Sequence, residues 1–337
     1  MPGGLNPAVF WFGSDFGNGV FVAVGNNLST TGNPASAWSL DGISWNQVLP
    51  AAGGLPDGAW QSVAFGNGIF VASQGTRGPH GNGPGTAYSA DGKTWRTDNT
   101  DIPQSTGGVG YNTICYSTIR SEFLTLGYGV AKSYTSTNGY TWTAQTFANP
   151  PQYNYSQVVA GSDRYVAVGT AGTAGYLSMY IMFGASTWVV GTSTLPFSFF
   201  GDPWFKSIAY SLGVFYTFDS QGGTFAYSST DGYTWVVAPT PTPFHVSDVA
   251  FNPSGKWVIV GGGNIAYSDN PLGPYTNSGP PSVVTASSWL GVNFAGGKYI
   301  ALGPSGSQGN GYSSDGIVWN IANAPPISFG LTWFYSP

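Results

Sequence analysis

The chain has 337 residues, of which only 7% are charged, 16% are aromatic, 51 are glycine and 24 are proline. A net charge of −5 with nine lysine and arginine residues excludes nucleic-acid recognition through a basic surface. The single cysteine, Cys115, excludes an internal disulfide framework and a thiolate metal cluster, and we expect its side chain to be a small buried hydrophobe.

A degenerate repeat of about 46 residues runs through the sequence from end to end. It is clearest at 60–95, where W-Q-S-V-A-F-G-N-G-I-F-V-A is followed by a variable loop and then by T-A-Y-S-A-D-G-K-T-W. Each unit closes on an aromatic residue 40 to 50 positions after the last, and there are seven: Trp45, Trp95, Trp142, Trp188, Trp235, Tyr275 and Trp319. The units predict seven structural repeats over 9–50, 57–103, 109–150, 154–196, 204–240, 245–280 and 288–325.

Within a unit, short apolar runs alternate with tight turns. In the second unit these runs are 62–65, 69–72 and 86–89, with a fourth starting at Thr94. Asn-Gly and Asp-Gly pairs between such runs are strong hairpin signals, because both residues tolerate positive φ. Helical periodicity is absent. The sequence therefore predicts an all-β, seven-bladed propeller with four antiparallel strands per blade, in one domain. We expect the tail, 326–337, to form a closing strand beside residues 9–16.

The turn between the third and fourth runs carries the motif S-x-D-G-x-x-W. Its residues include Ser39, Asp41, Trp45, Ser89, Asp91, Trp95, Asn138, Trp142, Asp231, Trp235, Asp315 and Trp319. The Asp or Asn side chain can accept backbone N–H groups inside the turn, Gly can take positive φ, and Trp can fill the space between blades. The motif resembles the Asp-box of sialidase-like propellers, shortened by one residue, and it predicts scaffold rather than catalytic residues.

The alternation of strand direction places these turns and the Gly-Asn-Gly turns on one face. The loops of variable length then share the other face, where function usually lies. Unusual side chains in or beside those loops are candidates for stacking on sugar rings and bonding to hydroxyls: Arg77, His80, Tyr153, Tyr155, Phe199, Asp202, Trp204 and His245. The alternative is that the aromatic residues only pack the loops together. The two histidines have no metal-binding spacing, so neither a metal nor a cofactor is expected.

The resemblance to sialidases raises the question of catalysis. Sialidases use three arginines, a Tyr–Glu pair and an Asp, whereas this chain has four arginines in all and one glutamate, Glu122, in a predicted tight turn. Another glycoside hydrolase would need two aspartates, and nothing in the spacing of Asp57, Asp101, Asp202 or Asp248 indicates such a pair. We therefore expect a protein that is not an enzyme.

The low charge and the abundance of Gly, Ser, Thr, Asn, Tyr and Trp resemble phage tail-fibre and baseplate proteins, in which Asp-box-like propellers occur. No signal peptide and no membrane span are visible, which suits assembly in a host cytoplasm. The expected partners are other virion structural proteins and a host-surface glycan, with no nucleic acid and no membrane insertion. The alternative is a secreted bacterial carbohydrate-binding or carbohydrate-active propeller.

Overall fold

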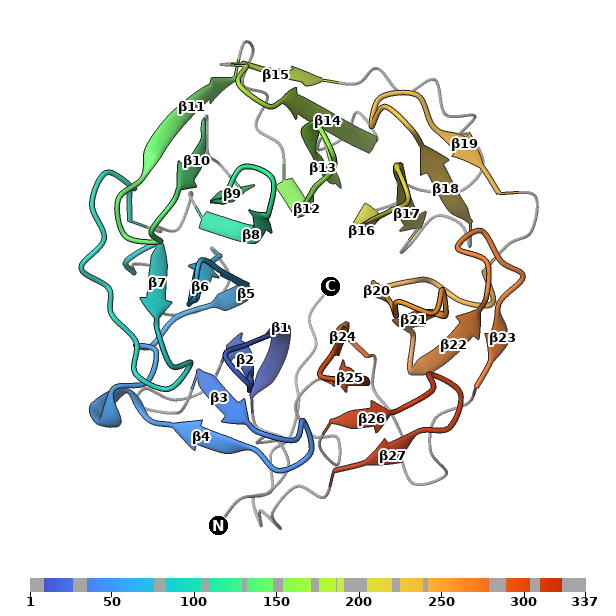
Figure 1. The fold of residues 1–337 in the computed structure, drawn as a ribbon, viewed down its shortest axis with the longest axis horizontal. Helices are drawn as coiled ribbons and strands as arrows, with labels where there is room; N and C mark the ends of the chain where they lie inside the picture. The colour runs from blue at the N-terminus through green and yellow to red at the C-terminus, as the bar shows by residue number, and fades with distance from the viewer. Residues whose placement is uncertain are drawn as a thin grey trace, which may run out of the picture.

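The chain is a seven-bladed β-propeller, with blades of antiparallel strands arranged in a ring (Figure 1). The innermost strands line a central channel. The structure is a computed structural model that describes residues 9–26, 35–75, 83–104, 110–128, 132–147, 154–170, 176–185, 187–190, 205–219, 225–238, 242–278, 289–303 and 310–322. Among these residues the one helix is a short 3-10 turn, η1 (Pro50–Ala52), and none has the length and hydrophobicity needed to cross a membrane.

Each blade uses consecutive strands, ordered from the channel outwards. The first three blades contain β1 (Phe10–Gly17), β2 (Val20–Asn26), β3 (Ser36–Ser39) and β4 (Asn46–Val48); β5 (Trp60–Gly66), β6 (Ile69–Gln74) and β7 (Thr86–Ser89); and β8 (Gly110–Ser117), β9 (Glu122–Tyr128), β10 (Lys132–Ser136) and β11 (Thr143–Phe147). Blades 4 and 5 contain β12 (Asn154–Ala160), β13 (Arg164–Thr170), β14 (Tyr176–Met182) and β15 (Thr187–Val190); and β16 (Phe205–Ser211), β17 (Val214–Asp219), β18 (Ala226–Ser229) and β19 (Val236–Val237). Blades 6 and 7 contain β20 (Asp248–Phe251), β21 (Trp257–Gly261), β22 (Asn264–Ser268) and β23 (Thr276–Asn277); and β24 (Gly291–Ala295), β25 (Lys298–Leu302), β26 (Gly311–Ser313) and β27 (Asn320–Ile321).

The outer edges of blades 2, 3 and 4 depart from this plan. In blade 2 the fourth strand is reduced to an isolated antiparallel bridge between Tyr88 and Arg96. The outer strands of blades 3 and 4, β11 and β15, pair in parallel at Thr146 with Thr187, which joins the two blades into one eight-stranded sheet. The other blades have four strands each, with the innermost strand first in the chain, so the predicted four-stranded blade is otherwise confirmed.

The first hairpins turn where the sequence predicts. Asn18 and Gly19 have φ of 49° and 75°, and Asn67 and Gly68 have 48° and 79°, as a two-residue hairpin with right-handed strand twist requires. The Asn side chains also reach the neighbouring blade, since Asn67 Nδ2 donates to the carbonyls of Ser121 (3.0 Å) and Thr137 (2.9 Å). The turn therefore fixes both the hairpin and its position beside the next blade.

The S-x-D-G turns are held by their own side chains. In the second blade Ser89 Oγ donates to Asp91 Oδ1 (3.0 Å), which also accepts the N–H groups of Lys93 (2.9 Å) and Thr94 (2.8 Å). The N–H of Gly92 donates to Ser89 Oγ at 2.9 Å. The same set of bonds recurs around Asp41, Asn138, Asp231 and Asp315. These contacts account for the motif as a turn-forming device.

The pKa of the Asp carboxyl in these turns is set by two opposing causes. Desolvation raises the pKa of Asp91, but the N–H groups of Thr94 and Lys93 and the hydroxyl of Ser89 together lower it below its usual value. Asp41, Asp231 and Asp315 have lowered pKa values for the same reason. The turns therefore favour the ionised carboxylate.

Asn138→Asp should stabilise the third blade at neutral pH. The new carboxylate would receive the N–H groups of Tyr140 and Thr141 that the amide oxygen accepts now, and charge-assisted bonds are stronger. We expect about 0.5 kcal/mol of added stability at pH 7, small because the site is exposed to solvent. The gain should vanish as the pH falls below about 4, where the carboxylate becomes protonated. Urea denaturation of both proteins at pH 7 and pH 3 measures this, and an equal difference at the two pH values would contradict it.

Each S-x-D-G turn also packs against the preceding blade. In three of these turns the residue after the Gly lies on an aromatic ring of that blade's third strand: Lys93 Nζ is 4.1 Å from the centroid of Trp38, and the rings of Tyr140 and Tyr88 are 5.5 Å apart. The ring of Tyr233 stands at 6.2 Å from that of Tyr180 in the same way. The motif therefore assembles the ring as well as the turn.

Blades 1 and 7 close the ring through side chains. Asn293 Nδ2 donates to the carbonyl of Ser14 (2.8 Å), Asn310 Nδ2 to that of Gly42 (3.1 Å) and Lys298 Nζ to that of Asp41 (2.9 Å). Ile300 of blade 7 packs with Trp11, Phe21 and Trp45 of blade 1 in one buried cluster. In the described residues both blades use only their own four strands, and the predicted closing strand at 326–337 lies outside those residues.

Candidate functional site

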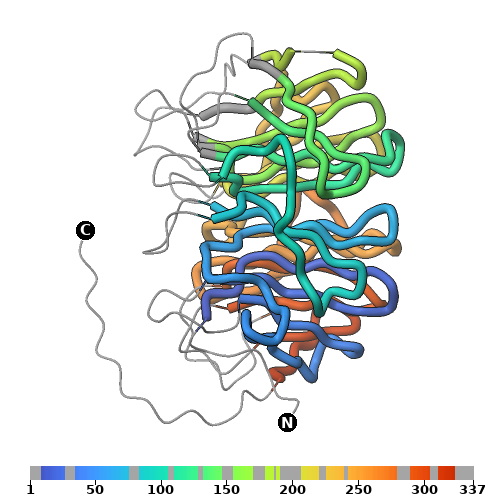
Figure 2. The backbone as a smooth tube through the Cα atoms, turned by 90° about the vertical axis from the view of Figure 1, so that its left-hand side faces the viewer, coloured from blue at the N-terminus to red at the C-terminus, as the bar shows by residue number. Residues whose placement is uncertain are grey.

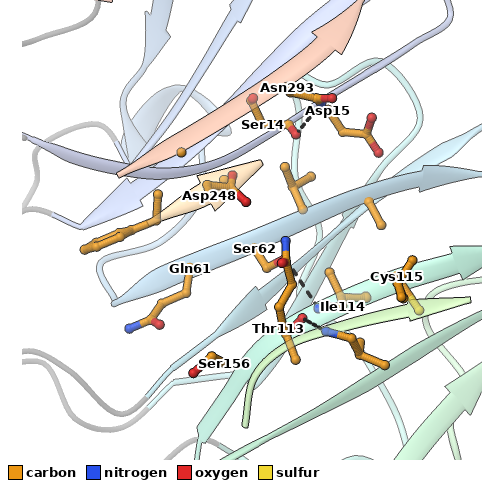
Figure 3. A pocket seen from close by; sticks show the side chains of 18 of the residues that line it. Ser14, Asp15, Gln61, Ser62, Thr113, Ile114, Cys115, Ser156, Asp248 and Asn293 are labelled. Atoms are coloured by element: carbon orange, nitrogen blue, oxygen red, sulfur yellow. Dashed lines mark hydrogen bonds between the residues drawn. The ribbon is translucent and has the colours of Figure 1, made fainter. Parts of the chain in front are cut away.

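The central channel contains a cavity of 660 Å³ lined by residues from all seven blades. Figure 3 shows part of this lining. This volume is within the range of about 300–1,000 Å³ that is typical of small-ligand sites. Seen from the side, the tight turns of the blades gather on one face, on the right in Figure 2. The innermost strands begin at the opposite end, since each of them runs towards a tight turn.

One residue per blade lines the cavity close to the start of each innermost strand. We call this set the channel mouth: Phe12, Gln61, Asn112, Ser156, Lys206, Ser247 and Leu290. In blades 1 to 5 these residues lie at an irregularity in the β ladder, for example between Trp60 and Ser62. A bulge redirects a side chain that a regular strand would place against the neighbouring sheet, and bulges are common beside functional sites. All seven residues are half-buried, as the lining of an accessible cavity should be.

The channel mouth is divided by polarity. Phe12 and Leu290 belong to adjacent blades, 1 and 7, and form its apolar part. The five residues from blades 2 to 6 carry amide, hydroxyl or ammonium groups. This arrangement places an apolar wall beside a continuous arc of hydrogen-bonding groups.

Below the mouth, side chains of the innermost strands bond to the backbone of the next blade. Thr113 Oγ1 accepts the N–H of Val158 (3.0 Å), Gln157 Oε1 accepts that of Ile208 (2.6 Å), and Asp248 Oδ2 accepts that of Val292 (2.9 Å). Ser62 Oγ receives the N–H of Ile114 at 3.4 Å. These inter-blade hydrogen bonds hold neighbouring blades in register around the channel.

Glycine replaces the bonding residue in blades 1 and 7, and a second polar residue compensates for it. A Cβ at Gly13 would lie 3.0 Å from the Gln61 carbonyl oxygen, so the backbones of blades 1 and 2 approach too closely for a side chain there. Two positions later, Asp15 Oδ2 accepts the N–H of Phe65 at 2.7 Å. In blade 7 the corresponding pair is Gly291 and Asn293, whose amide donates to blade 1.

The two carboxylates in this ring of hydrogen bonds have raised pKa values. Desolvation by burial raises the pKa of Asp15 to about 6, although it accepts bonds from Phe16, Phe65 and Asn293. Burial raises the pKa of Asp248 to about 7, although hydrogen bonds from Val292, Val249 and Gln157 act to lower it. Both residues keep some accessible surface along the cavity, so their protonation can respond to the solvent and to a ligand.

The structure corrects one of the predicted site residues. Tyr155 is 1% exposed, and its ring packs with Leu126, Val158 and Trp188 in the core, so it cannot stack on a ligand at the surface. His245 is exposed, two residues before the mouth residue Ser247. The remaining candidates lie outside the described residues: Arg77, His80, Tyr153, Phe199, Asp202 and Trp204.

The structure also contains a contact between Tyr165 and Glu122 that the sequence did not predict. Tyr165 Oη donates to Glu122 Oε1 at 3.1 Å, and Arg120 Nε lies 3.3 Å from the same oxygen. As predicted, Glu122 stands at a tight turn, at the start of β9, away from the channel mouth. No group of three or more His, Cys, Asp or Glu residues that could hold a metal occurs among the described residues.

No family model matches the chain, and no curated protein sequence matches it. Solved structures match it in fold. YCF48 from Cyanidioschyzon merolae is 14% identical over 91% of this chain and 96% of its own, with a TM-score of 0.60. Virginiamycin B lyase from Staphylococcus aureus is 11% identical over 91% of this chain and 96% of its own, with a TM-score of 0.67.

The lyase corrects the expectation that this chain is not an enzyme. That expectation rested on the missing sialidase residues, but a propeller of closely similar fold is named as a lyase, and a catalytically inactive variant of it was solved with quinupristin. Absence of one catalytic set therefore does not exclude catalysis on this fold. At 10–14% identity these likenesses concern architecture alone, and they identify the chain as a seven-bladed β-propeller.

Proposed function

We propose that the chain is a recognition propeller of a phage virion, which docks to neighbouring virion proteins and binds a host-surface glycan at the channel mouth. The observation that supports this best is the division of the mouth into an apolar part and a polar arc. Sugars present the same two chemistries, because C–H faces pack on aromatic and aliphatic side chains while hydroxyls bond to amides and alcohols.

Two structural neighbours support ligand binding by propellers of this architecture. One was solved as YCF48 bound to D1 peptide, and another as virginiamycin B lyase with quinupristin. Since the identities are only 14% and 10%, neither ligand carries over to this chain. The YCF48 complex makes a peptide the main competitor of the glycan, and a peptide belongs in the same test.

The virion setting is supported by composition and by the contrast between the two faces. A chain with 7% charged residues and 51 glycines resembles tail-fibre and baseplate proteins. The tight-turn face carries exposed apolar side chains at turn tips, including Leu40, Ile119 and Leu212, which suits contact with a neighbouring subunit. Tail or capsid genes next to the coding sequence would favour this setting, and secretion genes would contradict it.

Removing the two amides of the polar arc should weaken retention on glycans. We expect the double variant Gln61→Ala with Asn112→Ala to bind at least about tenfold more weakly than the natural protein, because each amide offers both a donor and an acceptor. Glycan arrays and adsorption to host cells measure the loss, with peptide arrays and product release followed in parallel. Leu212→Ala, on the opposite face and 99% exposed, is the control and should bind normally.

The outcomes separate clearly. Unchanged retention of the double variant, with an unchanged melting temperature, would contradict binding at the channel mouth. Retention on peptides but not on glycans would replace the ligand class, and release of a product from a bound glycan would add turnover to recognition.

A further inference from the structure

We infer that the channel mouth selects an uncharged pyranose, with Phe12 as the stacking platform that determines specificity. This inference rests on the proposed function and narrows its ligand from a glycan in general to a neutral sugar unit. Three features of the lining support it: the apolar part, the amide pair and the charges.

Phe12 is held in place to act as a platform. Its ring stacks on that of Phe10, with centroids 6.3 Å apart and an interplanar angle of 15°. The ladder irregularity between Trp11 and Gly13 brings Phe12 to the cavity while Trp11 stays buried in the core. Leu290 of the adjacent blade lines the same cavity, so one aromatic and one aliphatic side chain supply the apolar part of the mouth.

The amides of Gln61 and Asn112 come together beside the backbone of Gly75. A Cβ added at Gly75 would meet Asn112 Oδ1 at 2.7 Å and Gln61 Nε2 at 2.8 Å, so both side chains crowd the same point. Asn112 Nδ2 also donates to the carbonyl of Tyr155 at 3.4 Å, which orients this amide. Adjacent hydroxyls of a pyranose offer donors and acceptors that complement such a pair of amides. The polar arc is therefore most concentrated in blades 2 and 3, and blade 1 with Phe12 lies directly beside them.

The charges of the lining disfavour an anionic sugar. Asp15 and Asp248 line the cavity, and Lys206 is the one cation in the described lining, where no arginine occurs. An acidic sugar that extends below the mouth, past Lys206, would approach the two carboxyl groups, which costs free energy wherever they are ionised. A neutral sugar meets no such penalty.

Titration with matched sugars tests the inference. The probes are the methyl glycosides of glucose, galactose, mannose and N-acetylglucosamine, with methyl glucuronide as the anionic counterpart of the glucoside. Binding to the full chain is followed by calorimetry and saturation-transfer NMR. We expect at least one neutral glycoside to bind, Phe12→Ala to weaken it at least about tenfold, and Phe12→Leu to lie between the two.

The control is Phe225→Ala, which removes a 38% exposed aromatic side chain that does not line the cavity and should leave binding unchanged. Equal binding by Phe12→Ala, or tighter binding of the glucuronide than of the glucoside, would overturn the inference. If no neutral sugar binds while the Gln61→Ala, Asn112→Ala variant still loses retention on host cells, the inference fails and the proposed function survives with another ligand. If no neutral sugar binds and the double variant also keeps its retention on host cells, both the inference and the proposed function are rejected.

Discussion

The free energy of unfolding should decrease as the pH rises from about 4 to about 8, and Asp248→Asn should remove much of that decrease. The pKa of Asp248 is raised from 3.8 to about 7 because burial penalises the charged carboxylate more than its hydrogen bonds favour it. The unfolded chain releases this proton near pH 4, whereas the folded chain holds it to about pH 7. Stability from this group is therefore fully present below pH 4 and is lost as the pH rises through 7.

The expected difference at pH 8 is roughly 1–3 kcal/mol in favour of Asp248→Asn, less than the full pKa difference implies because the carboxylate keeps some contact with solvent. At pH 4 the two proteins should be nearly equal, since the amide resembles the protonated acid and keeps an acceptor for the N–H of Val292. Urea denaturation at closely spaced pH values measures both curves. Parallel curves would contradict the assignment.

Asp91→Asn is the control with the opposite sign. Hydrogen bonds in its turn lower the pKa of Asp91, so its contribution is present above about pH 4 and is lost only in stronger acid. Asp91→Asn should therefore lower the stability by a constant amount from pH 5 to 8, without changing the slope there, and the difference should disappear below about pH 4. Together the two kinds of carboxyl place maximum stability near pH 4 to 5.

The fold could be predicted because its signals are local. An Asn-Gly pair dictates a hairpin, and Ser, Asp and Gly spaced as in Ser89, Asp91 and Gly92 dictate a turn, whatever surrounds them. A signal that is weak in one unit becomes reliable because it recurs at the same place in other units of the repeat. The contacts between neighbouring blades were harder to predict from the sequence. A contact such as that of Lys93 with Trp38 joins residues 55 positions apart, and no sequence pattern links them.

The site was harder to predict because it depends on ladder irregularities. Gln61 and Asn112 look like ordinary strand residues, and only the bulge beside each brings them to the channel. Tyr155 shows the converse error. It occupies the repeat position of Trp11, Trp60 and Tyr111, all buried, and aligning the units on that aromatic would have identified it as core.

The inference about catalysis failed for a different reason. The residues expected of a sialidase define one chemistry on this fold, and their absence does not imply the absence of every other chemistry. The buried carboxyls Asp15 and Asp248, with pKa values of about 6 and 7, are the kind of perturbed groups that also occur at active sites. Product release therefore has to be measured alongside binding to the glycan arrays.

Gly92→Ala should destabilise the propeller by about 3 kcal/mol, far more than an alanine in a turn usually costs. Gly92 has φ of +70°, where a Cβ is strained by roughly 1–2 kcal/mol. A Cβ there would also lie 2.4 Å from Val22 Cγ2 of the preceding blade, inside a core that cannot expand freely. The glycines of the other S-x-D-G turns, Gly42, Gly139, Gly232 and Gly316, meet an apolar side chain of the preceding blade at 2.4–2.7 Å in the same way.

Gly68→Ala separates the two causes. Gly68 has a comparable φ of +79° in the same blade, but nothing lies within 4 Å of its Cβ position, so only backbone strain should appear, about 1 kcal/mol. Urea denaturation of both variants gives the difference of roughly 2 kcal/mol that belongs to the inter-blade contact. Equal destabilisation would mean that the S-x-D-G turn stabilises its own blade alone. A larger effect at Gly92 would mean that this S-x-D-G turn also stabilises the contact with the preceding blade.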